Sequence, residues 1–251
     1  MTIYKVIAMS LALALGACGS DNTTADGAGV KADAGGDVGT RIELSSKFKG
    51  VEAYTGHKGT VTIAVETFGG VNKVELLADG GKVLASATTA PFDLSWDTSS
   101  SDDGIVKLKL RSTDGVIVHT SDELPVIVYN TGQRVTLKES AEQEMTIPVG
   151  PALEFDLKWH WTMPADVTRI IAVAWWTNAA FKTDLALGTG ECPDNGTEAK
   201  RVASDTSPVV TEYKGSAALT KVMWFAHVGP TNKSEVEGQK TKVSTHVYLL
   251  R

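Results

Sequence analysis

The sequence predicts an all-β protein in which two β-sandwich domains follow a signal peptide and a disordered tether. Hydrophobic residues make up 42% of the 251 residues, which is enough to build a buried core. Apolar and polar residues alternate over short segments that recur about every 10 residues, with Gly/Asp turn signals between them. The second half contains no run of helical period long enough to require a helix. Antiparallel sheets therefore fit the pattern best.

Residues 1–17 have the pattern of a signal peptide. Lys5 supplies a positive charge before an apolar run of 10 residues from Val6 to Leu15. This run is too short to cross a bilayer as a helix, which needs about 20 residues. The segment is therefore predicted to be a targeting signal and not part of a folded domain.

The end of this leader indicates a lipid anchor. Leu15-Gly16-Ala17-Cys18 resembles the lipobox of bacterial lipoproteins. The resemblance implies cleavage before Cys18 and attachment of lipid to this cysteine, which would hold the chain on a membrane. By the same resemblance, Gly19 favours the outer membrane. An ordinary signal peptide with a chance cysteine is the alternative.

Residues 18–40 are predicted to form a disordered tether. The segment is rich in Gly, Ala, Asp and Thr and has no aromatic residue. Such a composition buries too little apolar surface to offset the entropy lost on ordering. We therefore expect a flexible connection between the lipid and the first domain.

Residues 41–130 are predicted to form the first β-sandwich. Five short segments have the apolar pattern of β-strands, most of them with apolar and polar residues in alternation. Three turn signals made of Gly and Asp lie between these segments. The predicted strands cover residues 61–65, 74–76, 92–96, 106–110 and 126–128, and the turns are Asp79-Gly80-Gly81, Asp102-Asp103-Gly104 and Asp114-Gly115.

This stretch resembles the bacterial immunoglobulin-like modules of extracellular proteins. The matching residues are Val74-Glu75-Leu76 before Asp79-Gly80, then Pro91-Phe92-Asp93-Leu94-Ser95-Trp96-Asp97-Thr98, Asp103-Gly104 and Pro125-Val126-Ile127-Val128. The turn at Asp114-Gly115-Val116 is shorter than the family often has. The resemblance implies an Ig-like sandwich that serves as a spacer or adhesion module, and it implies no catalytic residue.

Residues 131–251 are predicted to form a second antiparallel sandwich or jelly roll. Residues 170–176 are apolar on both faces, which is typical of a strand in the middle of a sheet. A glycine-rich loop is expected at residues 188–197. The predicted strands cover residues 145–149, 153–161, 170–176, 222–228 and 243–249.

The residue pattern favours a protein that is not an enzyme. The chain has no G-x-S-x-G, H-E-x-x-H or Walker motif. No two of its five histidines lie within five residues of one another, so we predict no metal site and no cofactor. His160, His227 and His246 fall on predicted strands and could still meet in space. A pair of carboxylates brought together by the fold stays possible.

Charge and cysteine content limit the partners further. The formal net charge of -6 argues against nucleic acid, whose binding needs clustered positive charge. If Cys18 is acylated, Cys192 has no partner for a disulfide, and it is either a small turn residue or a reactive thiol. The acidic loop near Asp194 either forms a simple turn or binds calcium through its oxygen ligands.

Tryptophan is the enrichment that points to a binding site. Five of the six tryptophans follow residue 158. Trp175 and Trp176 are adjacent on a predicted strand and must point to opposite faces, so one belongs to the core. An exposed indole offers a flat apolar face and one N–H donor, which suits a sugar ring or a protein partner. We predict ligand binding at Trp175 or Trp176.

Together these features predict a lipid-anchored, non-catalytic protein of the cell envelope, expected at the outer membrane. Its predicted function is binding or adhesion, with an envelope polysaccharide as the ligand and the Ig-like domain as a spacer. The alternative is a structural subunit of an envelope assembly that binds a protein partner.

Overall fold

The computed structural model describes residues 44–137, 142–149, 157–190, 197–215, 219 and 223–251. The predictions for the signal peptide, Cys18, the tether, Cys192 and Asp194 fall outside these residues. The described residues form β-strands and two short 3₁₀ helices, without an α-helix, which confirms the all-β class. Accordingly, this part of the chain has no helix that could span a membrane.

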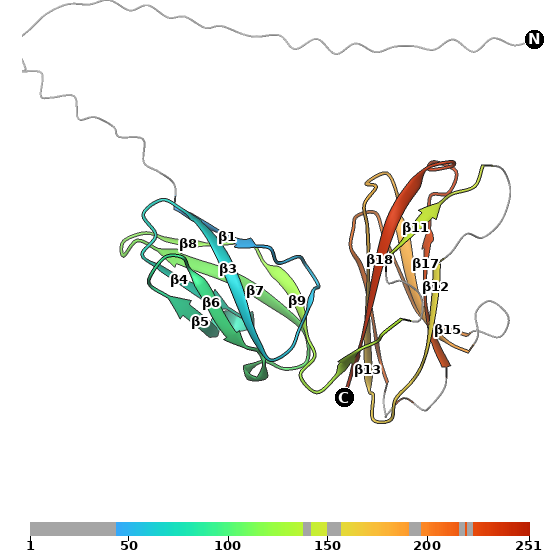
Figure 1. Ribbon diagram of the computed structural model, residues 1–251, viewed down its shortest axis with the longest axis horizontal. Coiled ribbons are helices and arrows are strands. Elements are labelled where there is room, and N and C mark those ends of the chain that lie inside the picture. The colour runs from blue at the N-terminus through green and yellow to red at the C-terminus, as the bar shows by residue number, and fades with distance from the viewer. Residues whose placement is uncertain (1–43, 138–141, 150–156, 191–196, 216–218, 220–222) are drawn as a thin grey trace, which may run out of the picture. The chain divides into compact units, whose positions relative to one another are not determined.

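The N-terminal sandwich, residues 45–128, consists of two sheets (Figure 1). The first sheet has the order β1-β3-β6, formed by β1 (Ser45–Lys49), β3 (Thr60–Phe68) and β6 (Asp93–Asp97). The second has the order β2-β9-β7-β4-β5, with β8 paired to β7; its strands are β2 (Gly56–His57), β4 (Lys73–Leu77), β5 (Val83–Ala87), β7 (Gly104–Thr113), β8 (Val118–Thr120) and β9 (Leu124–Val128).

Alternation along these strands places one set of side chains between the two sheets. Ile63 of β3 and Trp96 of β6 are fully buried, and they pack against Leu108 and Leu110 of β7 in one cluster. The opposite face of β7 carries charged residues, as period-two alternation requires. Burial of this face stabilises the sandwich by about 25 cal/mol for each Å² of apolar surface removed from water.

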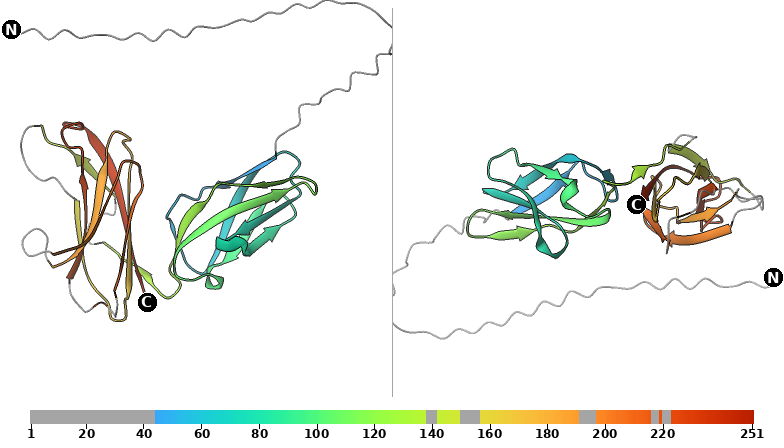
Figure 2. Two further views of the ribbon diagram at one scale, coloured as in Figure 1. Left: turned by 180° about the vertical axis from the view of Figure 1, so that it is seen from behind. Right: turned by 90° about the horizontal axis from the view of Figure 1, so that it is seen from below.

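The C-terminal sandwich, residues 133–250, also has two sheets (Figure 2). One has the order β10-β18-β13-β16, with β11 also paired to β18; its strands are β10 (Gln133–Arg134), β11 (Glu142–Thr146), β13 (Arg169–Trp176), β16 (Val209–Lys214) and β18 (Lys240–Leu250). The other has the order β12-β17-β14-β15, formed by β12 (Leu157–Thr162), β14 (Thr183–Thr189), β15 (Thr197–Ser204) and β17 (Met223–Pro230).

The predicted central strand at residues 170–176 lies in the middle of its sheet, and the apolar strand β17 lies in the middle of the other sheet. Strand β13 lies between β18 and β16, and β17 lies between β12 and β14. Ile170, Ala172 and Ala174 face the core, whereas Ile171 and Val173 belong to a second buried cluster on the other face. That cluster also contains Ile127 of β9 and Tyr248 and Leu250 of β18.

The predicted glycine-rich loop at residues 188–197 is wrong at both ends. Gly188 and Thr189 continue β14, and Thr197 begins β15, because the two strands pair through Gly188–Glu198 and Thr189–Thr197. Gly188 is required here for packing. A Cβ at this position would lie 2.2 Å from the Phe225 ring on the neighbouring strand. Its glycine therefore marks a close approach within a sheet rather than a turn.

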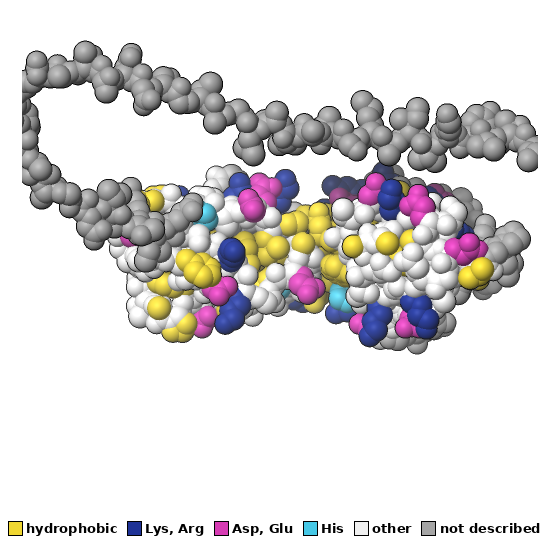
Figure 3. Space-filling view, turned by 90° about the horizontal axis from the view of Figure 1, so that it is seen from above, with side chains coloured by type: hydrophobic (Ala, Val, Ile, Leu, Met, Phe, Trp, Pro, Cys, Tyr) yellow, Lys and Arg dark blue, Asp and Glu magenta, His cyan; other side chains and the backbone are white. Residues whose placement is uncertain are grey.

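Charges of both signs are interspersed on the surface that Figure 3 shows. On β7, Lys107 and Lys109 both contact Glu123 at 3.1–3.2 Å. Arg111 donates to Glu75 at 2.7 Å, and Lys73 contacts the same carboxylate at 2.8 Å. The three basic side chains of β7 are therefore paired with the carboxylates of Glu123 and Glu75.

Candidate functional site

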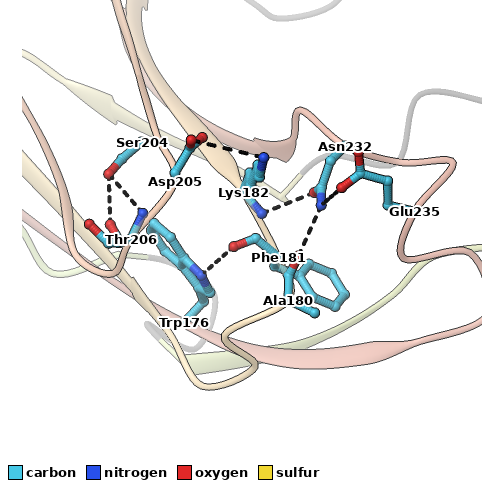
Figure 4. Close-up of polar contacts among 9 residues, drawn as sticks. All are labelled: Trp176, Ala180, Phe181, Lys182, Ser204, Asp205, Thr206, Asn232 and Glu235. Carbon is cyan, nitrogen blue, oxygen red and sulfur yellow. Dashed lines mark hydrogen bonds and ion pairs between the residues drawn. The ribbon is translucent and has the colours of Figure 1, made fainter. Parts of the chain in front are cut away.

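The two adjacent tryptophans of β13 point to opposite faces of their sheet, as the strand geometry requires. Trp176 is 6% exposed and belongs to the core between the sheets. Its indole Nε1–H donates to the Phe181 carbonyl oxygen at 2.9 Å (Figure 4). Trp175 is half-buried on the outer face. Trp176 is therefore a core side chain, and Trp175 alone stays a candidate for ligand binding.

A neutral histidine supports the Trp175 indole. The His246 ring of β18 meets it edge-on, with ring centroids 4.9 Å apart and an interplanar angle of 66°. Partial burial of His246, together with the positive charge of Arg134, lowers its pKa to about 4. The imidazole is uncharged at neutral pH, so it contacts the indole as an aromatic ring.

A row of polar residues lies beside Trp175 on the same face. Ser244 of β18 is directly opposite Trp175 in the sheet register, and Glu142 of β11 is opposite Ser244. Residues opposite each other in an antiparallel pair share a face with their Cβ atoms about 4.5–5.5 Å apart. Lys242, two residues before Ser244, reaches Glu142 with its ammonium at 3.5 Å. The face thus combines an indole, a hydroxyl and an ion pair.

The loop that follows Trp176 is held by one buried carboxamide, drawn in Figure 4. Asn232 Oδ1 accepts a hydrogen bond from the Lys182 backbone N–H at 2.9 Å. Its Nδ2 donates to the Ala180 carbonyl at 2.9 Å and to Glu235 Oε2 at 3.0 Å. This side chain makes hydrogen bonds at both ends of its amide and so fixes the loop at the end of β13.

The same loop is also tied to β18. The Asn178 backbone N–H donates to Thr241 Oγ1 at 3.1 Å, and Asn178 Nδ2 donates to the Lys240 carbonyl at 3.1 Å. These bonds lie close in sequence to Lys242 and Ser244. A binding face built on fixed strands loses little conformational entropy when a ligand binds.

The histidines considered as metal ligands do not all meet. His160 of β12 and His227 of β17 lie in one sheet, whereas His246 lies in the other. Within the described ranges, no group of three or more His, Cys, Asp or Glu side chains could hold a metal ion. The arrangement around Trp175 offers stacking and hydrogen bonding.

The sequence pattern missed the neighbours of Trp175. Ser244 and His246 occupy even positions of the predicted strand at residues 243–249, and the apolar residues Val243, Val247 and Leu249 occupy odd positions. That alternation already placed both residues on the outer face. What the sequence lacks is the pairing of this strand with β13, which lies about 70 residues earlier and is set by tertiary contacts.

A groove of about 450 Å³ lies in the N-terminal sandwich beside β1. The β1 side contributes Phe48 and Val51, and the segment around β8 contributes His119 and Ser121. Ser46 also lines it; this residue is buried, and its hydroxyl has no hydrogen-bond partner among the described residues.

Comparison with known proteins identifies the first module. Residues 50–110 match the bacterial Ig domain family, which confirms the resemblance of this stretch to bacterial immunoglobulin-like modules. Bacterial Ig domains are typical of extracellular or surface proteins. No curated protein sequence matches the chain.

Similar solved structures include a mannanase and two proteins solved with an oligosaccharide. An endo-β-1,4-mannanase from Thermotoga petrophila is 17% identical over 35% of this chain and 20% of its own, with a TM-score of 0.30. TmCBM61, solved with β-1,4-galactotriose, is 12% identical over 71% of this chain and 88% of its own, with a TM-score of 0.27. SGBP-B from Bacteroides ovatus, solved with a mixed-linkage heptasaccharide, is 12% identical over 81% and 53%, with a TM-score of 0.26. Scores this low assign no function to this chain.

Proposed function

We propose that this chain, whose residues 50–110 match a bacterial Ig domain, is a lipid-anchored and non-catalytic carbohydrate-binding protein of the cell envelope. Binding takes place around Trp175, where the outer face of β13 and β18 borders the buried cluster that contains Ile171 and Val173. The N-terminal sandwich acts as a spacer between the membrane and this face. The anchor is the lipid on Cys18, and the membrane is the outer one.

The observation that carries the proposal is a half-buried indole next to a polar row. A sugar ring has an apolar C–H face and a rim of hydroxyl groups. The indole face of Trp175 fits the first, and the Ser244 hydroxyl and the Glu142 carboxylate can bond to the second. His246 holds the indole from the side without adding charge.

The charges on this face favour a neutral glycan. Lys242 lies 3.5 Å from Glu142, and Lys240 lies 2.7 Å from Glu144, so each lysine is balanced by an acid. A strongly anionic polysaccharide would gain little net attraction from such pairs. Uncharged sugar hydroxyls can still donate to the carboxylates and accept from the ammonium groups.

Retention on insoluble envelope polysaccharides tests the binding proposal. The full chain, purified in detergent, is incubated with each polysaccharide and sedimented, beside Trp175→Ala and the control Met223→Ala. Met223 is another partly exposed apolar residue and belongs to the other sheet of the sandwich. We expect Trp175→Ala alone to lose retention. Equal retention of all three proteins would contradict the proposal.

The lipid anchor requires its own test. Cells that express the chain are fed radiolabelled palmitate, and the label is compared between the wild type and Cys18→Ala. Incorporation that depends on Cys18 supports the anchor, and partition of the label with outer membranes supports the localisation. A chain without label in both proteins would contradict the anchor and leave the carbohydrate proposal in place.

A protein partner is the second candidate, and the groove beside β1 favours it. Strand β1 is the edge of its sheet, and an edge can accept an added strand from another protein. The buried Ser46 hydroxyl, which has no hydrogen-bond partner within the part of the chain that the structure describes, could bond to such a strand. A photo-crosslinker at Ser121, which lines the groove, would capture one defined envelope protein if this candidate is correct.

A further inference from the structure

Three exposed apolar side chains gather at one end of the N-terminal sandwich. Val116 is 88% exposed, Val118 is 62% exposed and Phe68 is 46% exposed. Val116 and Val118 belong to the β7–β8 hairpin, and Phe68 ends β3. We call these three residues the apolar tip. Single exposed valines are ordinary, but a cluster at one end of a domain indicates a contact surface.

Contacts between turns show that the three residues share this end. The Asn72 backbone N–H, in the turn after Phe68, donates to the Thr113 carbonyl at the end of β7 at 2.9 Å. Asn72 also lies 3.4 Å from where a Cβ of Gly115 would stand. The turn that carries Phe68 therefore abuts the turn that carries Val116.

The hairpin presents Val116 to solvent in a fixed conformation. Asp114 Oδ1 accepts hydrogen bonds from the backbone N–H groups of Val116 and Ile117 at 2.8 and 2.7 Å. Gly115 has a φ of +101°, a value that residues with a side chain rarely adopt. Because these hydrogen bonds hold the turn, its conformation does not depend on packing of Val116 against the sandwich, and Val116 stays exposed.

The tip lies where the chain from the predicted lipid anchor reaches the domain. Leu44 is the first described residue, and its neighbour Ser45 pairs with Phe68 in the β1–β3 register. Figure 1 shows β1 and β8 near the end of the sandwich where the described chain begins, and β3 running along the sandwich. The lysine of the next outward-facing position, Lys47, lies 5.9 Å from the Phe68 ring centroid.

We propose that the apolar tip inserts into the interfacial region of the membrane to which the chain is anchored. The inference rests on the proposed lipid anchor, which keeps this end of the domain near a bilayer. Val116, Val118 and Phe68 would enter the boundary between headgroups and acyl chains, which lies about 5–10 Å deep. Lys47, beside the ring, would contact anionic headgroups.

A fluorescent probe at the tip measures this contact directly. The full lipidated chain with Cys192→Ser carries one added cysteine, either Val116→Cys or the control Val83→Cys. Val83 is an exposed valine of the same sandwich. It pairs with Leu77, at the end of β4 that lies away from the apolar tip. Each cysteine is labelled with an environment-sensitive dye, and the protein is reconstituted into phosphatidylethanolamine–phosphatidylglycerol vesicles that contain a lipid-attached quencher.

We expect quenching at position 116 to exceed that at position 83 by at least about twofold, with a blue shift only at 116. Vesicles of phosphatidylcholine alone should reduce the difference, because Lys47 loses its anionic contacts. Equal quenching at both positions, in a chain that floats with the vesicles, would overturn the tip and leave the anchor standing. A chain that does not float would overturn the anchor and the tip together.

Discussion

Replacing Asn232 by alanine tests whether one carboxamide holds the loop behind the binding face. Asn232 is 9% exposed, and its side chain makes three hydrogen bonds of 2.9–3.0 Å. A typical hydrogen bond contributes about 1 kcal/mol net. Loss of three should therefore lower the free energy of unfolding by about 3 kcal/mol, because water replaces them poorly at a buried site.

Urea denaturation, followed by tryptophan fluorescence, provides the assay. A loss of this size should lower the transition midpoint while the slope of the transition stays unchanged. Ser234→Ala serves as the control, because Ser234 is exposed in the same segment. We expect the control to change the free energy of unfolding by less than about 0.5 kcal/mol.

Asn232→Asp refines the test, because it keeps the acceptor and removes the donor. The aspartate can still accept from the Lys182 N–H, but it places a carboxylate oxygen where the amide nitrogen lay 3.0 Å from Glu235 Oε2. This variant should be destabilised at pH 7 and recover partly in acid, where the carboxyl groups are protonated. If Asn232→Ala behaves like Ser234→Ala, or Asn232→Asp is as stable as the wild type at pH 7, the carboxamide does not hold this loop.

Two further predictions concern stability elsewhere in the chain. Gly188→Ala places a Cβ 2.2 Å from the Phe225 ring and 2.5 Å from the Thr197 carbonyl, and should cost about 1–3 kcal/mol in urea denaturation. Gly70→Ala, where an added Cβ meets nothing within 4 Å, is the control; equal stability of the two variants would refute the close approach. The hydrogen bond from Arg111, followed by that from Lys73, lowers the pKa of Glu75 below its usual 4.5, so its stabilising effect is present above that pH and is lost as the pH falls. Glu75→Gln should therefore lower stability at pH 7 and weaken its fall in acid, whereas identical pH profiles would show that the carboxylate contributes nothing.

The strands with clear alternation could be predicted from the sequence because their chemistry is local. Val106, Leu108 and Leu110 alternate with charged residues, and β7 forms with those apolar residues in the core cluster. Strand β13 was predicted as a central strand because it is apolar on both faces. Because both faces of β13 are apolar and buried over most of the strand, the sequence does not indicate which of its two tryptophans enters the core.

Other features depend on contacts between distant segments and could not be predicted. Strand β15 is mostly exposed and carries charged residues such as Glu198 and Arg201, so it lacks an apolar face to reveal it. An edge strand of this kind is specified by its pairing with β14. Likewise, the contact between Trp175 and His246 arises from sheet register, which single-sequence patterns do not encode.

The central claim is that carbohydrate binds at Trp175, and a binding constant tests it most directly. Calorimetric titration of the full chain with soluble fragments of the retained polysaccharide would compare the wild type, Trp175→Ala and Met223→Ala. A central aromatic contact contributes about 2 kcal/mol or more, so Trp175→Ala should weaken binding by at least about tenfold. Met223→Ala should bind like the wild type. Unchanged affinity in a folded Trp175→Ala protein would contradict the account.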